Sequence, residues 1–600
     1  MAEDIDFNDI LENIFLSENT QCKESYNEGY RTGCDAGNPE GFHLGYHRGA
    51  EIGRELGYYY GIVNNYLEED DKSEVKHSEK TIKQLKRVKE LIDTFPRTNS
   101  EQHDILALLE IIRAQYKKAS MESTITKIHH HLDRILKYLN PLLPLANCHM
   151  VEFFTECHWD ELLPKTLRQL LNEWDLNFAI EKFWTYTSDQ NNNDRCELRQ
   201  WIHTAQSHCL TVNNGYCLSI DQLQSHINSW GGIIRPEIKV QEFMTSKKSY
   251  EVQAMSSLVA SLYNVTGSTH CLEAGGGRGH LLVALTLGYG IPSLTVDCDE
   301  IALKNAAKRV KIIQKQWQAI AKKITNGTEE CIGESIRCDI HRFASAFVTT
   351  KTDISTIMRN AFPEHCDKDV KILLTGLHTC GNLGPDSLKI FKSQPSTMGL
   401  FNVPCCYHLL TEKVDAGLFD AFQRDYGCGQ ESVHGFPMSE YLRGYNLGRN
   451  ARMLAAQSID RVVSQKQLPS KSLLYRALFQ VIVKRHVPGF ALTEGRLKRL
   501  ATNCNDFTEY FKMADSVLAL GLFDRLPDSY LKELSRDLNC QWKQVVLFYL
   551  LRLCLAQVIE SVLLLDRLLY LLENGFEKAY IVKLFDPVLS PRCHSIVAVR

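Results

Sequence analysis

Glycines and carboxylates near the middle of the chain are spaced in a way that could bind a ligand. Glu273 ends one apolar segment, Asp297 ends the next, and between them lie three glycines at alternate positions, Gly275, Gly277 and Gly279. Such a turn lets the backbone take positive φ angles and approach a ligand closely. A helix beginning at about residue 280 would direct its free N–H groups and positive dipole end at that ligand. The sequence therefore predicts a strand–turn–helix–strand unit with a ligand at the turn.

The spacing of this turn distinguishes between two cofactors. A dinucleotide fold requires G-x-G-x-x-G, but here the third glycine comes one position early and His280 occupies the slot. The pattern E-x-G-x-G-x-G followed by Asp297 resembles motif I of class I S-adenosylmethionine (SAM) methyltransferases. SAM has no pyrophosphate, so an acidic residue such as Glu273 is tolerable near its sulfonium and amino group. The Asp297 carboxylate could accept hydrogen bonds from both ribose hydroxyls. We therefore expect SAM, with a dinucleotide or a purely structural turn as the alternatives.

Reactive side chains follow two later apolar segments, 370–377 and 397–403. In open α/β sheets ligands bind outside the carboxyl ends of the strands, so both groups should face the transferred methyl group. A histidine titrates near neutrality and could orient the acceptor or take its proton, while cysteines would shape the pocket. The candidate catalytic residues are His378, Cys380, Asn382, Cys406 and His408.

The histidines and cysteines of this group, with Cys405, admit two other interpretations. They are zinc-type ligands, but the spacings H-x-C and C-C-x-H are tighter than in usual zinc sites, so we expect no metal ion. Alternatively, the cysteines are ordinary core residues at strand ends.

Further residues could contact the cofactor or a phosphate. Lys248 precedes a helix that leads into the glycine turn, and it could bind the SAM carboxylate or a phosphate, or lie on a solvated surface. Residues 335–338 are predicted as a strand ending at Asp339, whose carboxylate could accept the adenine amino group. Arg449 and Arg452 lie one helical turn apart, and they could clamp a phosphate or be structural.

The elements that must position these residues define the fold class. The segment 370–377 is a continuous apolar run, as a central parallel strand should be, and 579–600 resembles two strands and a turn. We predict an α/β fold with a Rossmann-like class I methyltransferase sheet, a C-terminal antiparallel hairpin, large helical insertions and an all-α N-terminal module. The predicted domains are the N-terminal module 1–120, a helical part 121–240, the SAM-binding core 241–449, a helical insertion 450–575 and the hairpin 576–600.

Composition places the chain among globular proteins of more than one domain. It has 600 residues, 44% of them hydrophobic and 23% charged, with a net charge of −4. No global basic surface indicates nucleic acid or an anionic membrane, although a local patch is possible. The 20 scattered cysteines contain no C-x-x-C pair, and with no secretory pattern at the start they indicate reduced thiols in the cytoplasm or the nucleus. Residues 545–572 are apolar but interrupted by four charges, so we expect a buried helix pair and no membrane contact.

Glycines also recur in strict period four in the N-terminal region. Nine of them, from Gly29 to Gly61, would trace a slowly turning ridge on a helix. Each helical glycine costs roughly 1 kcal/mol relative to alanine, so the helix requires close approach of another helix. We predict a break at Asn38-Pro39, with Asn38 as the N-cap. A flexible linker is the alternative.

Residues 1 to about 120 resemble the Yae/Lto family of Gly-x-x-x repeat proteins. The later stretches KRVKELIDTFP (86–96) and HDILALLEIIRAQYKKAS (103–120) are similar to that family too. The resemblance implies pairing with a helical partner protein that carries the same repeat, and an adaptor role in cytosolic iron–sulfur protein maturation. Recruitment by that family uses its extreme C-terminus, whereas this chain continues past residue 120. The join between the two parts is either a true fusion or a merged gene model.

From about residue 125 to the end, the chain resembles the methyltransferase-like protein 25 family. The resemblance is carried by stretches such as MTSKKSYEVQAMSSLV (244–259), TGLHTCGNL (375–383), VPCCYHLLTE (403–412) and VKLFDPVLSPRC (582–593). It implies a SAM-dependent methyltransferase. Two of these motifs are similar to segments of a tRNA ribose 2′-O-methyltransferase family, which favours RNA as the acceptor. The chain departs from the family that it resembles at Asn382, where aspartate is usual, and at Pro404, where glycine is usual. A SAM-binding pseudoenzyme or scaffold is therefore the alternative function.

Overall fold

The fold is described here from a computed structural model. It describes residues 7–72, 79–97, 104–189, 196–212, 215–238, 244–324, 340–365, 369–412, 435–490, 497, 500, 504, 506–536 and 538–600. The chain divides into two compact units, Met1–Thr126 and Lys127–Arg600. The boundary lies inside helix α3 (Ile105–Leu139), which also continues through the predicted domain boundary at residues 120–121.

The first unit is helical, as predicted. Its helices are α1 (Phe7–Lys72), α2 (Glu79–Asp93) and α3 (Ile105–Leu139). Small apolar clusters join them, and one of these contains Leu56, Leu109 and Ile112. Arg113 of α3 donates two hydrogen bonds to the carboxylate of Glu55 on α1, both at 2.6 Å. These contacts hold the second half of α1 against its neighbours.

Helix α1 contradicts the predicted helix break and also excludes the flexible-linker alternative. It is continuous from Phe7 to Lys72, so the predicted break at Asn38-Pro39 is wrong and the linker alternative is excluded. A proline removes one N–H donor from the backbone hydrogen bonds of a helix, and the helical turns on either side of it can keep their own hydrogen bonds. Seven glycines of the repeat have open space where a Cβ atom would lie: Gly29, Gly33, Gly45, Gly49, Gly53, Gly57 and Gly61. No described part of this chain therefore fills the glycine ridge.

The second unit is built on an eight-stranded, mostly parallel sheet. Its order is β1-β7-β8-β6-β5-β2-β3-β4, and β8 runs antiparallel to both of its neighbours. This arrangement confirms the predicted Rossmann-like sheet and its C-terminal hairpin. The strands are β1 (Cys217–Leu218), β2 (His270–Ala274), β3 (Ser293–Asp297), β4 (His341–Ser345), β5 (Ile372–Cys380), β6 (Thr397–Cys405), β7 (Lys578–Lys583) and β8 (His594–Val599).

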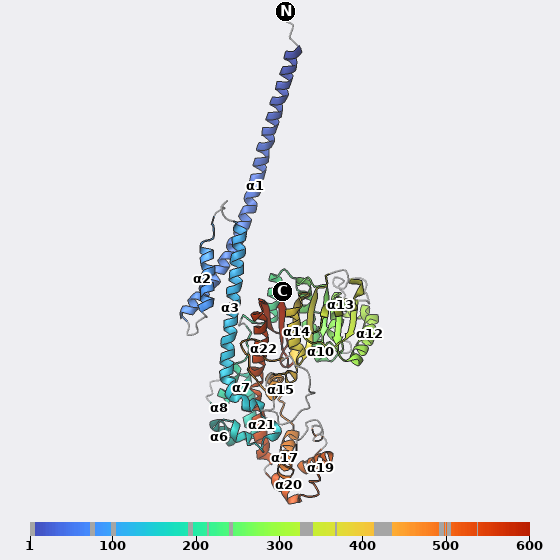
Figure 1. Ribbon diagram of the computed structural model, residues 1–600. Helices are drawn as coiled ribbons and strands as arrows, with labels where there is room; N and C mark the ends of the chain where they lie inside the picture. Colours follow the sequence, from blue (N-terminus) through green and yellow to red (C-terminus); the bar gives the residue numbers. More distant parts are fainter. Residues whose placement is uncertain are drawn as a thin grey trace, which may run out of the picture. The chain divides into compact units, whose positions relative to one another are not determined.

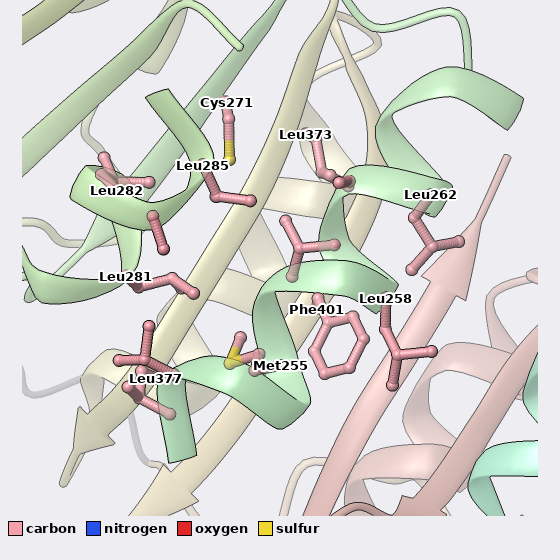
Figure 2. Packing of buried hydrophobic residues seen from close by; sticks show 14 of the residues in the cluster. Met255, Leu258, Leu262, Cys271, Leu281, Leu282, Leu285, Leu373, Leu377 and Phe401 are labelled. Atoms are coloured by element: carbon pink, nitrogen blue, oxygen red, sulfur yellow. The ribbon is translucent and has the colours of Figure 1, made fainter. Parts of the chain in front are cut away.

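Helices cover both faces of the sheet (Figure 1). Helix α10 (Ser246–Val265) packs on β5 and β6, and its Met255, Leu258 and Leu262 meet Phe401 and other sheet side chains in the core (Figure 2). The same core includes residues of α9 (Ile220–Ser229), α11 (His280–Val283), which continues as one π-helical turn to Gly288, and α12 (Glu300–Ile324). Helices α14 (Leu383–Ser393) and α22 (Ala556–Glu573) contact each other and strands β5 to β8, and α13 (Ile354–Ala361) contacts β4. Strands buried on both faces explain why β5 reads as a continuous apolar run.

The remaining described helices precede or interrupt the sheet. They are α4 (Leu143–Asn147), α5 (His158–Leu162), α6 (Lys165–Glu173), α7 (Leu176–Ser188), α8 (Glu197–Ser207), α15 (Arg449–Ala455), α16 (Ile459–Ser464), α17 (Lys471–His486), α19 (Phe507–Leu518), α20 (Asp528–Leu534) and α21 (Leu538–Leu553). Residues 540–573 are apolar and long enough to cross a membrane, but 89% of their most apolar window is buried inside the protein. They form two helices, α21 and α22, as predicted.

Candidate functional site

The glycine turn has the backbone that its sequence predicts. The φ angles of Gly275, Gly277 and Gly279 are 71°, 49° and 66°, a region that favours glycine. A Cβ atom at Gly275 would lie 2.6 Å from the Leu383 side chain. The turn leaves β2 and leads directly into α11, so the helix N-terminus is at the turn. This geometry provides a close-approach cradle for a ligand.

A fourth glycine, Gly276, was missed by the sequence reasoning because it falls between the motif positions. A Cβ atom there would lie 2.7 Å from Thr295 Cγ2 and 2.8 Å from Glu273 Oε2. We expect Gly276→Ala to displace the Glu273 carboxylate and to lower ligand affinity about tenfold, since such overpacking typically costs 1–3 kcal/mol. The measurement is ligand titration by calorimetry. Gly61→Ala is the control for a glycine substitution elsewhere, because Gly61 lies in helix α1 with open space at its Cβ position. Equal affinities in the wild type and Gly276→Ala would contradict the prediction.

Asp297 closes the turn from the neighbouring strand. The Gly277 N–H donates to its Oδ2 at 2.8 Å, and the Asp299 N–H donates to its Oδ1 at 2.9 Å. Each carboxylate oxygen has a second lone pair, so Asp297 can still accept hydrogen bonds from a ligand. The position at the carboxyl end of β3 matches the one predicted for ribose hydroxyls.

Glu273 is a buried carboxyl group beside the same turn. Glu273 is only 3% exposed, and its Oε2 has no hydrogen-bond partner among the described residues. Burial raises its pKa to about 8, although the nearby Lys248 ammonium opposes the shift. A buried polar atom without a partner is costly, and at a ligand site it marks where a ligand group fits. A positively charged ligand group would supply the missing interaction.

Lys248 lies near two buried carboxylates. Its amide is capped by Thr245 at the start of α10, and its Nζ lies 3.7 Å from Oε2 of Glu251. Burial lowers the pKa of Lys248, while the charges of Glu251 and Glu273 oppose that shift. The Lys248 side chain is therefore mostly buried, at 25% exposed, and its contact with a cofactor stays a prediction.

His378 is held by Glu251, a residue that the sequence reasoning did not single out. Oε2 of Glu251 lies 3.2 Å from His378 Nε2, and its Oε1 accepts a hydrogen bond from Ser590 Oγ at 2.8 Å. Glu251 is 1% exposed. Burial raises its pKa, but the hydrogen bond and charge of His378, together with Ser590 and Lys248, lower it to about 2. Glu251 is therefore ionised and fixes one ring nitrogen of His378.

Three thiols meet beyond His378. Cys380 Sγ lies 3.1 Å from Cys405 Sγ and 3.5 Å from Cys406 Sγ. The two predicted strand ends thus lie side by side, as expected from neighbouring parallel strands. Hydrogen bonds from the other two thiols lower the pKa of Cys406. His408 follows in a short 3₁₀ turn, Tyr407–Leu409, and its charge also acts on Cys406.

Asn382 takes part in a local bridge. Its Nδ2 donates to Thr411 Oγ1 at 2.9 Å, and its Oδ1 accepts from the Thr411 N–H at 3.0 Å. The side chain thus ties the start of α14 to the segment after β6. An aspartate could accept from both Thr411 groups, so these contacts are compatible with either residue.

Two other predictions have different outcomes. Asp339 and the predicted strand 335–338 lie outside the described residues. On the side of β3 away from β2, the described neighbour is β4, so the residues after Ser345 stand at the carboxyl end of β4. The phosphate clamp of Arg449 and Arg452 is wrong, because both residues are buried and Arg452 donates to the carbonyl oxygens of Tyr407 and Leu410.

Known proteins share the part of the chain that carries this site. The sequence profile of a family described as "Methyltransferase domain" matches residues 247–413. That range holds the glycine turn, both buried carboxylates and the two strand ends. The protein carries a methyltransferase domain. It is similar to proteins named "Probable methyltransferase-like protein 25". The mouse protein is 27% identical over 587 residues, covering 79% of this chain and 96% of the relative. The human protein is 27% identical over 592 residues, covering 78% and 96%. No solved structure matches the chain.

The methyltransferase domain explains why the sheet and turn are arranged as they are. A methyltransferase needs a methyl donor and an acceptor beside it, and open α/β sheets bind their ligands outside the carboxyl ends of the strands. The glycine turn follows β2 and Asp297 ends β3, while His378 lies on β5, the neighbour of β2 on its other side. The Glu251–His378 pair joins residues 127 positions apart, so no local pattern could have indicated it. The i, i+3 spacing from Lys248 to Glu251 could have pointed to Glu251, but not to its contact with His378.

Proposed function

We propose that this protein binds SAM in the glycine turn and transfers its methyl group to an acceptor, with RNA as the first class to test. The observation that carries the proposal is the buried Glu273 carboxyl group, whose Oε2 lacks a partner beside the turn. A sulfonium or ammonium group would stabilise its ionised form. A dinucleotide, with its anionic pyrophosphate, would be repelled at the same place.

Each residue of the site would contact a different part of SAM. The Asp297 carboxylate would accept the ribose hydroxyls, and the loop glycines would let the backbone lie against the cofactor. Glu273 would face its positive charge, and Lys248 could bind its carboxylate. When bound, SAM supplies a methyl group activated by the sulfonium.

His378 is the candidate proton acceptor on the other side of the site. Its Nε2–H would donate to the ionised Glu251, which leaves Nδ1 with a free lone pair. Nδ1 could then take the proton of an acceptor hydroxyl or amine as the nucleophile attacks. Glu251 would stabilise the resulting imidazolium, so it is a positioning residue.

The test of this function is a binding and labelling experiment with the full chain. We expect SAM to bind with micromolar affinity in calorimetry. Methyl-labelled SAM should transfer its label to one fraction among total RNA and total protein. Absence of SAM binding by the folded protein would overturn the proposal. Binding without transfer to any fraction would support the alternative of a SAM-binding pseudoenzyme.

Replacing His378 tests its catalytic role. We expect His378→Ala to lower kcat about 100-fold or more, because general base catalysis contributes roughly 10²–10⁴-fold, while the Kd for SAM stays the same. His408→Ala is the control, since it removes a histidine from the next strand end and leaves the Glu251 pair intact. A larger loss of rate in His408→Ala than in His378→Ala would reverse the assignment.

We also propose that α1 pairs with a helix of a partner protein that carries a small-residue repeat. The support is the open space at the described glycines of the repeat, flanked by exposed Tyr30, Tyr46 and Tyr58. Close helix contacts require small residues on both sides, so the partner should carry small residues at the same spacing. The full chain should co-purify with a Gly-x-x-x protein identified by mass spectrometry. A Gly49→Leu, Gly53→Leu variant should lose it, and Arg54→Leu should keep it. Retention by the glycine variant would contradict the pairing.

A further inference from the structure

The three thiols of the methyltransferase domain form a compact group. Their sulfur atoms, from Cys380, Cys405 and Cys406, all lie within 4.8 Å of one another. The separations of 3.1 and 3.5 Å are far longer than a disulfide bond of about 2.05 Å. They are close to the roughly 3.8 Å that separates sulfurs on a tetrahedral zinc ion with Zn–S bonds of about 2.3 Å. Small adjustments of the side chains would complete that geometry.

Two backbone irregularities bring the thiols together. Strand β5 has a register shift between Gly376 and Thr379, so that Cys380 lies directly beside Cys405 of β6. Cys406 has a φ of 49°, a left-handed conformation that side chains rarely adopt. Successive residues of a strand point to opposite faces, so Cys405 and Cys406 could not converge in regular extended backbone. Such irregular backbone costs about 1–3 kcal/mol per residue and concentrates at functional sites.

We propose that Cys380, Cys405 and Cys406 bind a thiophilic divalent metal ion of the zinc type through three sulfur ligands. Sulfur ligands select zinc and related soft ions over magnesium or calcium. Three protein ligands leave a fourth position for water or a substrate atom, which is the pattern of catalytic rather than structural zinc sites. Cys380 is exposed and gives the ion an entry path, while Cys405 is buried.

The sequence spacing alone argued against this site, because usual zinc sites separate their ligands by two or more residues. The geometry removes that objection, since one ligand comes from β5 and two come from the end of β6. The site does not depend on the proposed methyl transfer, because metal binding can be measured without SAM or an acceptor. The three thiols lie at the strand ends near His378. The fourth coordination position of the metal ion would therefore face the side of the domain where the methyl acceptor is proposed to bind.

The test is the metal content of the reduced full-length protein, followed by cobalt substitution. We expect about one equivalent of zinc by elemental mass spectrometry. Replacement by Co²⁺ should give thiolate-to-cobalt charge-transfer absorption in the near ultraviolet. Cys380→Ser should lower the affinity for Co²⁺ at least tenfold. Cys406→Gly should do the same while relieving the left-handed backbone, so this variant should fold at least as well as the wild type.

Cys157→Ser is a matched control. Cys157 is also exposed and left-handed, with a φ of 47°, and it stands outside the three-thiol group. It should keep full metal content and the cobalt spectrum. The proposal is overturned if the folded, reduced protein takes up neither ion. It is equally overturned if Cys406→Gly binds as tightly as the wild type, or if thiol counting under native conditions finds Cys380 and Cys405 joined in a disulfide.

Discussion

At pH 8 the Glu273→Gln variant should be more stable than the wild-type protein and should bind SAM more weakly. Burial raises the pKa of Glu273 to about 8, so its ionised form is disfavoured in the folded state. The unfolded chain releases this proton near pH 4.5, and between pH 4.5 and 8 the folded state holds more protons. Stability therefore falls as the pH rises through this window.

The size of the gain follows from two opposing terms. With a pKa of about 8 in the folded state and 4.5 in the unfolded chain, the carboxyl of Glu273 costs on the order of 4 kcal/mol of stability at pH 8, and glutamine removes this cost. The glutamine amide introduces two N–H donors that need acceptors, and an unmet donor costs about 1–3 kcal/mol. We expect a net stabilisation of about 1 kcal/mol at pH 8, which changes to a net destabilisation at pH 5, where the removed cost is below about 1 kcal/mol. Denaturant unfolding at both pH values measures it.

Glu251→Gln is the natural comparison, because it is also an isosteric change of a buried carboxylate. The pKa of Glu251 is lowered to about 2, so its contribution to stability is present above pH 4.5 and is lost as the pH falls toward 2. This variant should be less stable than the wild type at pH 8. If both substitutions shift stability in the same direction, the two carboxyl groups do not have the opposite environments described here.

The affinity for SAM should depend on the protonation state of Glu273. Because a cationic ligand favours the ionised carboxylate, SAM binding below pH 8 must release a proton from Glu273. The Kd should therefore fall by up to about tenfold per pH unit between pH 6 and 8 and then level off. In Glu273→Gln it should be weak and nearly independent of pH over this range. A wild-type Kd that is constant from pH 6 to 8 would contradict the assignment.

The parts of the fold that local spacing encodes were predictable from the sequence. The glycine turn, Asp297 at the end of β3 and the terminal hairpin each depend on residues within about 25 positions of one another. Positive φ at a glycine and burial of a continuous apolar strand are local consequences of residue type. The two strand ends that carry His378 and Cys406 were predictable as neighbours, because parallel strands end at one edge of the sheet.

Contacts set by tertiary structure were not predictable. Glu251 reaches His378 only because α10 packs across β5, and Ser590 reaches Glu251 from the hairpin turn. The thiols converge because of a register shift and one left-handed residue, neither of which has a sequence pattern at cysteine. The continuity of α1 through Pro39 was missed because proline usually kinks or breaks a helix interior, whereas this long helix continues on both sides of it.

Replacing Asp297 should have the largest effect on cofactor binding. Its carboxylate receives the Gly277 N–H at 2.8 Å and the Asp299 N–H at 2.9 Å. An asparagine has only one acceptor oxygen, so its N–H₂ would face one of these donors. It would also lose the charge-assisted bonds to the ribose hydroxyls, which are worth about 1.5–3 kcal/mol. We expect Asp297→Asn to raise the Kd for SAM about 100-fold in calorimetry and, because one backbone N–H loses its acceptor, to lower stability by about 1 kcal/mol.

Asp299→Asn is the matched control, because it removes the same charge two residues away. Asp299 accepts from the N–H groups of Ile301 and Ala302 as the cap of α12, a role that asparagine performs equally well. Its SAM affinity should stay within about twofold of the wild type. Equal weakening by both substitutions would mean that net charge, and not the contact, controls binding.

S-adenosylhomocysteine separates the roles of the two acidic residues. It has the same ribose as SAM but lacks the methyl group and the positive charge of the sulfonium. Asp297→Asn should therefore weaken both ligands to a similar degree. Glu273→Gln should weaken SAM more than S-adenosylhomocysteine, because only SAM offers a sulfonium to the buried carboxylate. If Glu273→Gln weakened both ligands equally, the carboxylate would be recognising a group that they share, such as the amino group, and not the sulfonium.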